Sequence, residues 1–366
     1  MLTTCDDWIR KLEAESLVIA GMDLRKRIAG TTLLKNDAAS LANCEAHCRL
    51  IVRAVEGLAA NEANRSGTYL RDVLCSLIQR ETYGAFAELA AYDWLARCYV
   101  AFESQVELTS NDVLGVNGVT LDGKMRHGAY FDVKAFGFNE RLAQRLKELL
   151  DEEFPAEQVL ITESWDLSVT DFSALIASAS TIVRELRSKR LFRRGRLLVR
   201  LVPKQPVTVS HRSLEPYRLA HENARYPFRD AKQFAKNAPF ILLFIRHPWF
   251  SPGNNHTDFG GTETTFTRSL ARRAFMQFSG DTTPLETVCS DVPPDATLAD
   301  ASRLLSAIFF VNVWPPEADP GNPRKLPSWL YLNPRATHPL TRGSLSLFRS
   351  ENRHGTVIDD FVDDDY

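Results

Sequence analysis

Two aspartates and a lysine lie in a short, largely apolar segment, residues 117–138, with the sequence NGVTLDGKMRHGAYFDVKAFGF. Strands disfavour aspartate, so Asp122, Asp132 and Lys134 must either face solvent or serve a purpose. Carboxylate oxygens are ligands of hard divalent cations, and Mg²⁺ is commonly held by one or two of them. The residue types therefore indicate metal-assisted chemistry beside a positive charge.

The spacing predicts how these side chains meet. A three-residue turn at 126–128 closes a β-hairpin if Gly128 takes the left-handed conformation. Residues 125 and 129 then pair, and Asp122 falls opposite Asp132, with Cβ atoms roughly 4.5–5.5 Å apart. Two repelling carboxylates are a poor stabilising device, so this register favours a cation site. Alternation along the strand places Lys134 on the face of Asp132 and gives the core face to Phe131, Val133 and Ala135.

A third carboxylate precedes the hairpin. The segment GAFAELAAYDWL, residues 84–95, reads as an alanine-rich helix that carries Glu88. Gly84, Ala85 and Tyr92 share its helix face, and such small residues allow close packing on a sheet. From there the carboxylate of Glu88 could reach the two aspartates.

This order of residues resembles the PD-(D/E)XK nuclease superfamily, which has the restriction-endonuclease-like fold. Asp122 matches the first acid, Asp132-Val133-Lys134 matches (D/E)XK, and Glu88 matches the helix glutamate of many members. Leu121 stands where the family name has proline, and the gap between the acids is at the short end of the family's range. The resemblance covers about residues 81–165, roughly a quarter of the chain.

The resemblance implies a core of one helix, three antiparallel strands, another helix and a further strand. It also implies metal-dependent hydrolysis of DNA phosphodiesters by an endonuclease or exonuclease of restriction or phage-defence type. Asp122, Asp132, Glu88 and the Val133 carbonyl would hold Mg²⁺, for which Mn²⁺ would substitute, and Lys134 would orient or help deprotonate the attacking water. Two alternatives remain open: an RNA nuclease, and a non-catalytic nucleic-acid-binding or scaffold protein with a degenerate nuclease core. Retention of both acids and the lysine favours catalysis.

A basic segment, residues 184–204, could bind phosphates. It contains nine Lys or Arg residues and one Glu, in a chain whose net charge is only −2. Arginine and lysine contacts to phosphate supply much of the affinity for nucleic acid. We therefore expect DNA, or RNA, to contact this segment and the hairpin through Arg190, Arg193, Arg194, Arg196, Lys124 and Arg126.

Two other motifs are weaker. Gly118-x4-Gly123-Lys124 fits most of a phosphate-binding P-loop, but Met125 stands where Ser or Thr should bind Mg²⁺. Cys44, His47 and Cys48 have helical spacing and no fourth partner, so they indicate a buried helix face and not zinc. Neither motif is a better candidate for a functional site than the hairpin.

The elements that position the acids follow from periodicity. A helical region is expected over 1–80 and a meander of three strands from about 99 to 136. The nuclease core would cover 81–250, including a helix at about 220–238 that leads into a buried strand, with the basic insertion around 184–204. Residues 251–366 would pack on the core as an α/β extension and end in an acidic tail, 358–366, outside any sheet. The fold class is α/β (α+β), a mixed sheet flanked by helices.

The amino-acid composition indicates the general class of protein. The chain has 366 residues, of which 44% are hydrophobic and 25% charged, which is typical of a globular protein. Six scattered cysteines favour a reducing compartment, and the start of the chain lacks a signal peptide. The apolar run PFILLFI is too short to span a bilayer. We expect a cytoplasmic protein without a membrane partner, acting as a homodimer or with a companion protein of a defence system.

Overall fold

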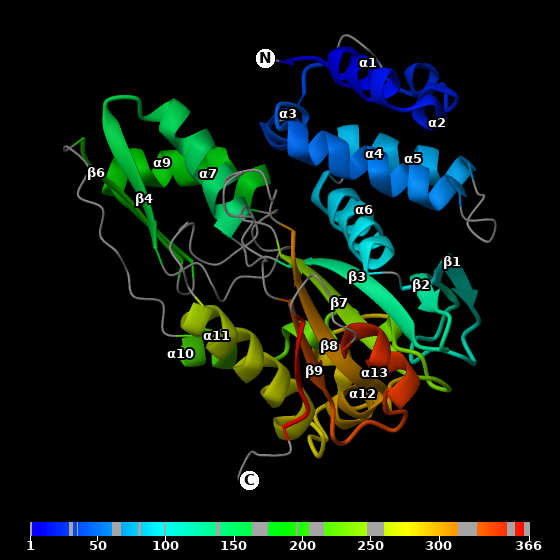
Figure 1. The fold of residues 1–366 in the computed structure, drawn as a ribbon. Helices are drawn as coiled ribbons and strands as arrows, with labels where there is room; N and C mark the ends of the chain where they lie inside the picture. The colour runs from blue at the N-terminus through cyan, green and yellow to red at the C-terminus, as the bar shows by residue number, and fades with distance from the viewer. Residues whose placement is uncertain are drawn as a thin grey trace.

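A computed structural model of the chain contains two β-sheets surrounded by helices, which makes the protein a mixed α/β fold as expected (Figure 1). The structure describes residues 2–28, 32–34, 36–60, 67–79, 82–98, 100–136, 140–162, 175–194, 197–204, 216–246, 260–313, 328–349 and 356–361. Among these residues, no helix combines the length and the apolar character needed to cross a membrane.

The larger sheet has seven strands in the order β1-β2-β3-β7-β8-β9-β10. The expected meander is confirmed, because β1 (Phe102–Leu108), β2 (Val119–Met125) and β3 (Tyr130–Phe136) are antiparallel neighbours. On the other side of β3 lies β7 (Phe240–Arg246), which runs parallel to it. The sheet is completed by β8 (Leu305–Asn312), parallel to β7, by β9 (Ser328–Leu332), antiparallel to β8, and by β10 (Thr356–Asp359), parallel to β9.

Both faces of this sheet are covered, so its middle strands are apolar throughout. All residues of β7 are buried, and its apolar residues alternate between two hydrophobic cores. Ile241, Leu243 and Ile245 face the core shared with the N-terminal helices, whereas Phe240, Leu242 and Phe244 face the other core. The helices of this second face are α10 (Pro216–Glu222), α11 (Gly260–Arg272) and α12 (Leu298–Leu304).

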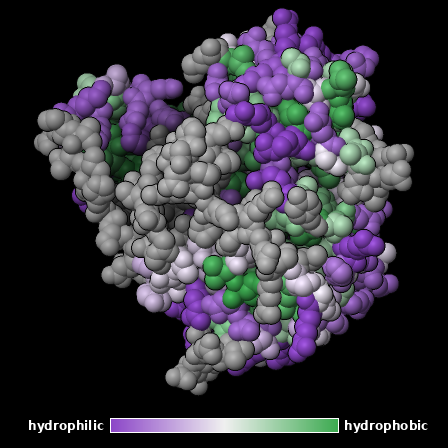
Figure 2. Space-filling model, viewed as in Figure 1, coloured by the Kyte–Doolittle hydropathy of each residue, from purple (hydrophilic) through white to green (hydrophobic). Residues whose placement is uncertain are grey.

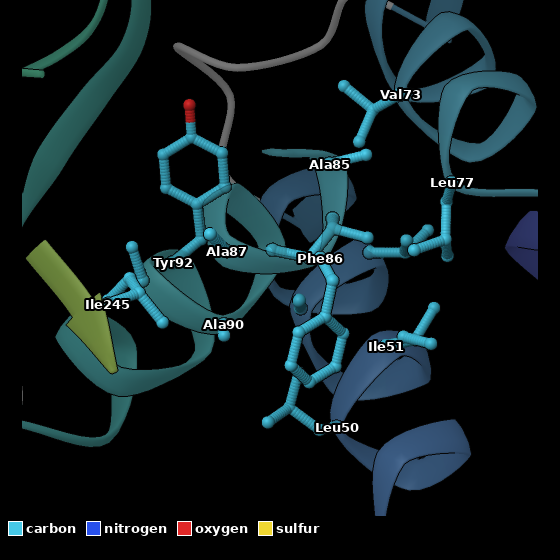
Figure 3. Packing of buried hydrophobic residues seen from close by; sticks show 14 of the residues in the cluster. Leu50, Ile51, Val73, Leu77, Ala85, Phe86, Ala87, Ala90, Tyr92 and Ile245 are labelled. Carbon is cyan, nitrogen blue, oxygen red and sulfur yellow. The ribbon is translucent and has the colours of Figure 1, made fainter. Parts of the chain in front are cut away.

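The N-terminal region is helical and packs on the sheet through its last helix. Its longer helices are α1 (Cys5–Glu15), α3 (Asn36–Ala42), α4 (Glu45–Ala60), α5 (Gly67–Gln79) and α6 (Thr82–Arg97), with the short α2 (Leu17–Ala20) after α1. Phe86 of α6 points towards Leu50 and Ile51 of α4, while Tyr92 and Ile245 lie on the other side of α6 (Figure 3). Helix α6 therefore links the helical region to the strands that carry the acids.

Residues 140–203 form a separate module. Helices α7 (Glu140–Glu153) and α9 (Ala179–Lys189) share a third core with a three-stranded sheet in the order β4-β6-β5. The strands are β4 (Glu157–Thr162), β5 (Leu191–Arg194) and β6 (Leu197–Pro203). The resemblance would make 157–162 the further strand of the nuclease core, and this is wrong, because β4 pairs with β6. The strand beside β3 is β7, from much later in the chain.

Two other expectations need correction. The single helix at about 220–238 is wrong: α10 ends at Glu222, and two short 3-10 turns, Tyr226–Phe228 and Ala231–Gln233, follow it. Pro227 disfavours a continuous helix there, since proline lacks the N–H that the helix interior needs.

The acidic tail at 358–366 was expected outside any sheet, but residues 356–359 form β10, which extends the same sheet as β1, β2 and β3. Phe361 is also buried, stacked on Tyr331. Apolar side chains between the aspartates, and the ion pair from Arg268 to Asp359, explain why this segment docks. Residues 362–366 lie outside the described residues.

The β2–β3 hairpin is unusually tight at Gly123. A Cβ atom there would lie 2.4 Å from Cζ of Phe131 and 2.6 Å from the carbonyl oxygen of Glu103 on β1. Only glycine therefore allows the Phe131 ring to pack across β2 beside the first acid.

Gly123→Ala is expected to destabilise the protein by about 1–3 kcal/mol, because the clash involves backbone as well as a ring. Urea unfolding would measure the loss. Gly57→Ala, in the interior of α4, is the matched control: no atom beyond its chain neighbours and the backbone of its own helix lies within 4 Å of its added Cβ, and it should stabilise by up to about 1 kcal/mol. Equal midpoints for Gly123→Ala and the wild type would contradict the tight approach.

Candidate active site

The register expected for the hairpin is confirmed. Gly123 pairs with Phe131 and Lys124 with Tyr130. Gly128 has a φ of +89°, the positive value that the turn needs. The same register, continued by one residue, sets Asp122 opposite Asp132.

The β2–β3 ladder ends just before these two aspartates. Beyond Gly123 no further backbone pairing joins the two strands in the described residues, and the backbone N–H of Val133 donates instead to Oδ2 of Asp122, at 2.6 Å. The Asp122 side chain thus replaces a main-chain acceptor where the strands separate. This separation makes room for two carboxylates inside the sheet.

Lys134 is held by Asp132 and lies near another acid. Its Nζ is 2.6 Å from Oδ2 of Asp132 and 4.0 Å from Oδ2 of Asp230. Asp132 is only 2% exposed, whereas the side chains of Lys134 and Asp230 are 25% and 45% exposed. Among these three charged groups, Lys134 and Asp230 are therefore the more exposed and Asp132 is the buried one.

Glu88 is fixed from the opposite side by three donors. Its Oε1 accepts hydrogen bonds from the hydroxyl of Tyr69, from the hydroxyl of Tyr92 at 3.1 Å, and from Nε2 of Gln105 at 3.0 Å. The Tyr92 hydroxyl also lies 2.8 Å from the carbonyl oxygen of Asp122, and its ring stacks on Phe102. Helix α6 and strand β2 are thereby joined at the site.

The three carboxyl groups interact in a water-poor environment. Burial, together with the carboxyl of Glu88, raises the pKa of Asp122 to about 7. Burial and the facing Asp122 raise the pKa of Asp132 to about 8, although Lys134 opposes the shift. Burial also raises the pKa of Glu88. Burial alone would lower the pKa of Lys134, but the carboxylates of Asp132 and Asp230 outweigh it and raise that pKa.

One oxygen in this cluster is engaged by an ion pair alone. Oδ2 of Asp132 is buried and lies 2.6 Å from Nζ of Lys134, with no further hydrogen-bond partner. Buried charged oxygens are paired or coordinate metals. Within the described ranges no group of three or more His, Cys, Asp or Glu side chains is placed to hold a metal ion. The pair Asp122 and Asp132 nevertheless fits Mg²⁺, which commonly takes one or two carboxylates and keeps several waters.

The structure brings together four of the expected residues: Glu88, Asp122, Asp132 and Lys134. Val133 lies between Asp132 and Lys134 on β3, with its side chain in the core. Sequence reasoning missed Tyr69, Gln105 and Asp230. Tyr69 and Asp230 lie far in the sequence from the segment that carries Asp122 and Lys134. No sequence pattern predicts the positive φ of Gln105.

The described residues expected to bind nucleic acid belong to two elements, the β2–β3 hairpin and the β4-β6-β5 sheet, which lie at opposite sides of the molecule (Figure 1). Lys124 lies over the Tyr130 ring and Arg126 is exposed in the hairpin turn. In the other group, Arg190 makes a two-pronged ion pair with Glu157, with both contacts at 3.0 Å. Arg193 and Arg194 are exposed on β5, on a module whose coloured surface is mostly hydrophilic in Figure 2. Arg196 lies outside the described residues.

No protein-family model, no curated protein and no solved structure matches this chain. The geometry of the site therefore has to carry the functional argument alone.

The two raised aspartate pKa values predict a pH-dependent stability. In the unfolded chain each aspartate has its ordinary pKa of 3.8, whereas in the folded protein the values are about 7 and about 8. The folded state therefore binds more protons, and metal-free protein should lose stability as pH rises from about 4 to about 8, by on the order of 1 kcal/mol per pH unit per group. Thermal melts in EDTA between pH 5.5 and 8.5 would measure this, with the double variant Asp122→Asn, Asp132→Asn as control. If wild type and double variant lose stability in parallel, the aspartates are not responsible.

Proposed function

We propose that the protein is a metal-dependent nuclease that hydrolyses DNA phosphodiester bonds. The observation that carries the proposal is the pair of opposed aspartates at the point where β2 and β3 separate, with Lys134 beside them. Burying two like charges costs stability unless a cation or protons compensate. Phosphoryl transfer also benefits from a positive charge beside the phosphate, and Lys134 on the same strand would supply it.

Asp122, Asp132 and the carbonyl group of Val133 are the groups that would hold Mg²⁺ or Mn²⁺. When bound, such an ion polarises a phosphoryl oxygen and lowers the pKa of a coordinated water. The burial of Asp132 beside the carboxyl group of Asp122 supports this assignment. Asp122 is already oriented by the N–H of Val133, so one of its oxygens is fixed before any ion arrives.

Lys134 acts as a fixed positive charge. The neighbouring carboxylates keep it protonated, since they raise its pKa. A protonated ammonium donates hydrogen bonds and cannot accept a proton, so Lys134 orients the attacking water and offsets the negative charge that grows on the phosphoryl oxygens. Its partial exposure lets it contact the substrate without moving.

Glu88 has a different role from the two aspartates. Tyr69, Tyr92 and Gln105 already engage its Oε1, and its carboxyl group also hydrogen-bonds with that of Asp122, so its contribution is to position Asp122. A direct contact with an ion would use its other oxygen.

One experiment tests the proposal. Purified protein is incubated with supercoiled plasmid, linear duplex, single-stranded DNA and RNA, each with Mg²⁺, Mn²⁺ or EDTA. Metal-dependent cleavage of any DNA substrate supports a deoxyribonuclease, and cleavage of RNA alone identifies the RNA nuclease alternative. Binding without cleavage under every condition favours the non-catalytic nucleic-acid-binding alternative and contradicts the proposal.

The basic residues of β5 are proposed to contact DNA phosphates. Replacing Arg193 and Arg194 by Ser should weaken DNA binding and reduce the slope of log affinity against log salt by about 0.9 for each lost contact. Arg193→Ser alone is measured beside the double variant, because Arg194 also interacts within the protein. Arg190→Ser is a comparison variant, since its side chain is paired with Glu157. Binding measured by fluorescence anisotropy over a range of salt would decide, and an unchanged slope would assign these arginines to another partner.

A further inference from the structure

Gln105 has an unusual backbone conformation for a residue inside a strand. Its φ is +54°, in the left-handed region, although it lies in the middle of β1. Residues other than glycine seldom adopt positive φ, and such conformations are retained where the surrounding structure or a function requires them. The strand pairing continues on both sides: Ser104 pairs with Gly123 and Val106 with Leu121. Gln105 therefore stands opposite Asp122 without disturbing the register.

The side chain of Gln105 shows what this conformation achieves. Its Nε2 donates to Oε1 of Glu88 at 3.0 Å. The other two donors to this oxygen, Tyr69 and Tyr92, lie on helices. Among the described residues, Gln105 is therefore the donor to Glu88 that lies on the sheet. Glu88 in turn interacts with the carboxyl group of Asp122. Besides its backbone pairing with β2, the edge strand thus reaches the side chain of the first acid through the amide of Gln105 and the carboxyl group of Glu88.

We infer that Gln105 is a positioning residue of the active site, held in a left-handed conformation so that its amide fixes Glu88 against Asp122. The inference rests on the proposed function for its catalytic consequence. The contact itself does not depend on that function. Groups of this kind, which orient the residues that hold a metal, typically change affinity or activity by about 10- to 100-fold when removed.

Two substitutions distinguish the effect of the backbone conformation of Gln105 from the effect of its side-chain amide. Gln105→Gly and Gln105→Ala both remove the hydrogen bond to Glu88, but only glycine accepts positive φ freely. The glycine variant should therefore melt about 1–2 °C higher than the alanine variant. Both should cleave DNA with a kcat lowered about 10-fold or more and with KM unchanged, since Gln105 does not touch the substrate. Glu107→Gln, at an exposed position of the same strand, should behave as the wild type.

A thermodynamic cycle tests the contact without using activity. Melting is measured for Gln105→Ala, Glu88→Ala and the double variant, because residues in contact show non-additive effects on stability. Additive effects in this cycle, or an alanine variant that melts as high as the glycine variant, would overturn the inference. So would wild-type cleavage rates in both Gln105 variants. If the wild type itself does not cleave while the cycle is non-additive, the proposed function fails and the positioning of Glu88 by Gln105 stands.

Discussion

Asp132→Asn and Lys134→Ala are each expected to reduce DNA cleavage by at least about a hundredfold while leaving the protein folded. The asparagine keeps the shape of Asp132 and removes a buried carboxyl group that pairs with Lys134. The alanine removes the ammonium group that lies 2.6 Å from that oxygen. Neither change touches the core side of β3, where Phe131 and Val133 are buried. Rates on plasmid DNA with saturating Mg²⁺ would measure the effect.

Asp93→Asn provides a matched control for a buried aspartate in an ion pair. Asp93 is 2% exposed and contacts Arg53 and Arg97 on the helical side of the molecule. Its replacement should lower the melting temperature and leave the cleavage rate per folded molecule unchanged. If Asp132→Asn and Lys134→Ala both lose cooperative melting, the two residues are structural and the assignment of catalysis to them is wrong.

Millimolar Mg²⁺, Mn²⁺ or Ca²⁺ is expected to raise the melting temperature of the wild type. In the metal-free protein the carboxyl group of Asp122 raises the pKa of the buried Asp132, and a cation would offset the negative charge that the pair carries when ionised. A ligand present at a hundred times its dissociation constant stabilises the folded state by about 2.7 kcal/mol. Differential scanning calorimetry would resolve a change of that size.

Asp122→Asn should distinguish the effect of charge repulsion between the two aspartates from the effect of metal binding. It should make the metal-free protein slightly more stable and cancel the metal-induced shift, because one charge and one ligand are lost together. An equal response of wild type and variant to metal would show that the two aspartates do not form a site. The scan is repeated with a non-cleavable duplex and Ca²⁺, since DNA itself supplies oxygen ligands to the ion.

The hairpin could be predicted from the sequence because its geometry is local. Gly128 closes the turn, and the turn fixes which residues face each other as far as Asp122 and Asp132. Tyr92 could be placed near Glu88 for the same reason, since the two lie one helical turn apart on α6. Local rules of turn and helix periodicity therefore located the centre of the site.

Asp230 could not be predicted in this way, because no local rule brings it to Lys134. Its segment is fixed by backbone hydrogen bonds from Leu114 to Phe234 and from Gly115 to Lys232, which join two loops distant in the sequence. The pairing of β4 within a second sheet, and of β10 along the edge of the first, likewise depends on tertiary contacts. The secondary-structure propensities of the residues do not encode such tertiary contacts.

The insertion of residues 140–203 between β3 and β7 has a consequence for biosynthesis. β3, which carries Asp132 and Lys134, gains its second neighbour only when β7 emerges, about a hundred residues later. At typical translation rates of roughly 5–20 residues per second, this interval lasts roughly 5–20 s. During it the inserted module, which has its own core, can fold first. On the ribosome the nascent chain therefore carries both acids for several seconds before the sheet closes around them, and a chain released before residue 240 would lack the strand that buries Asp132.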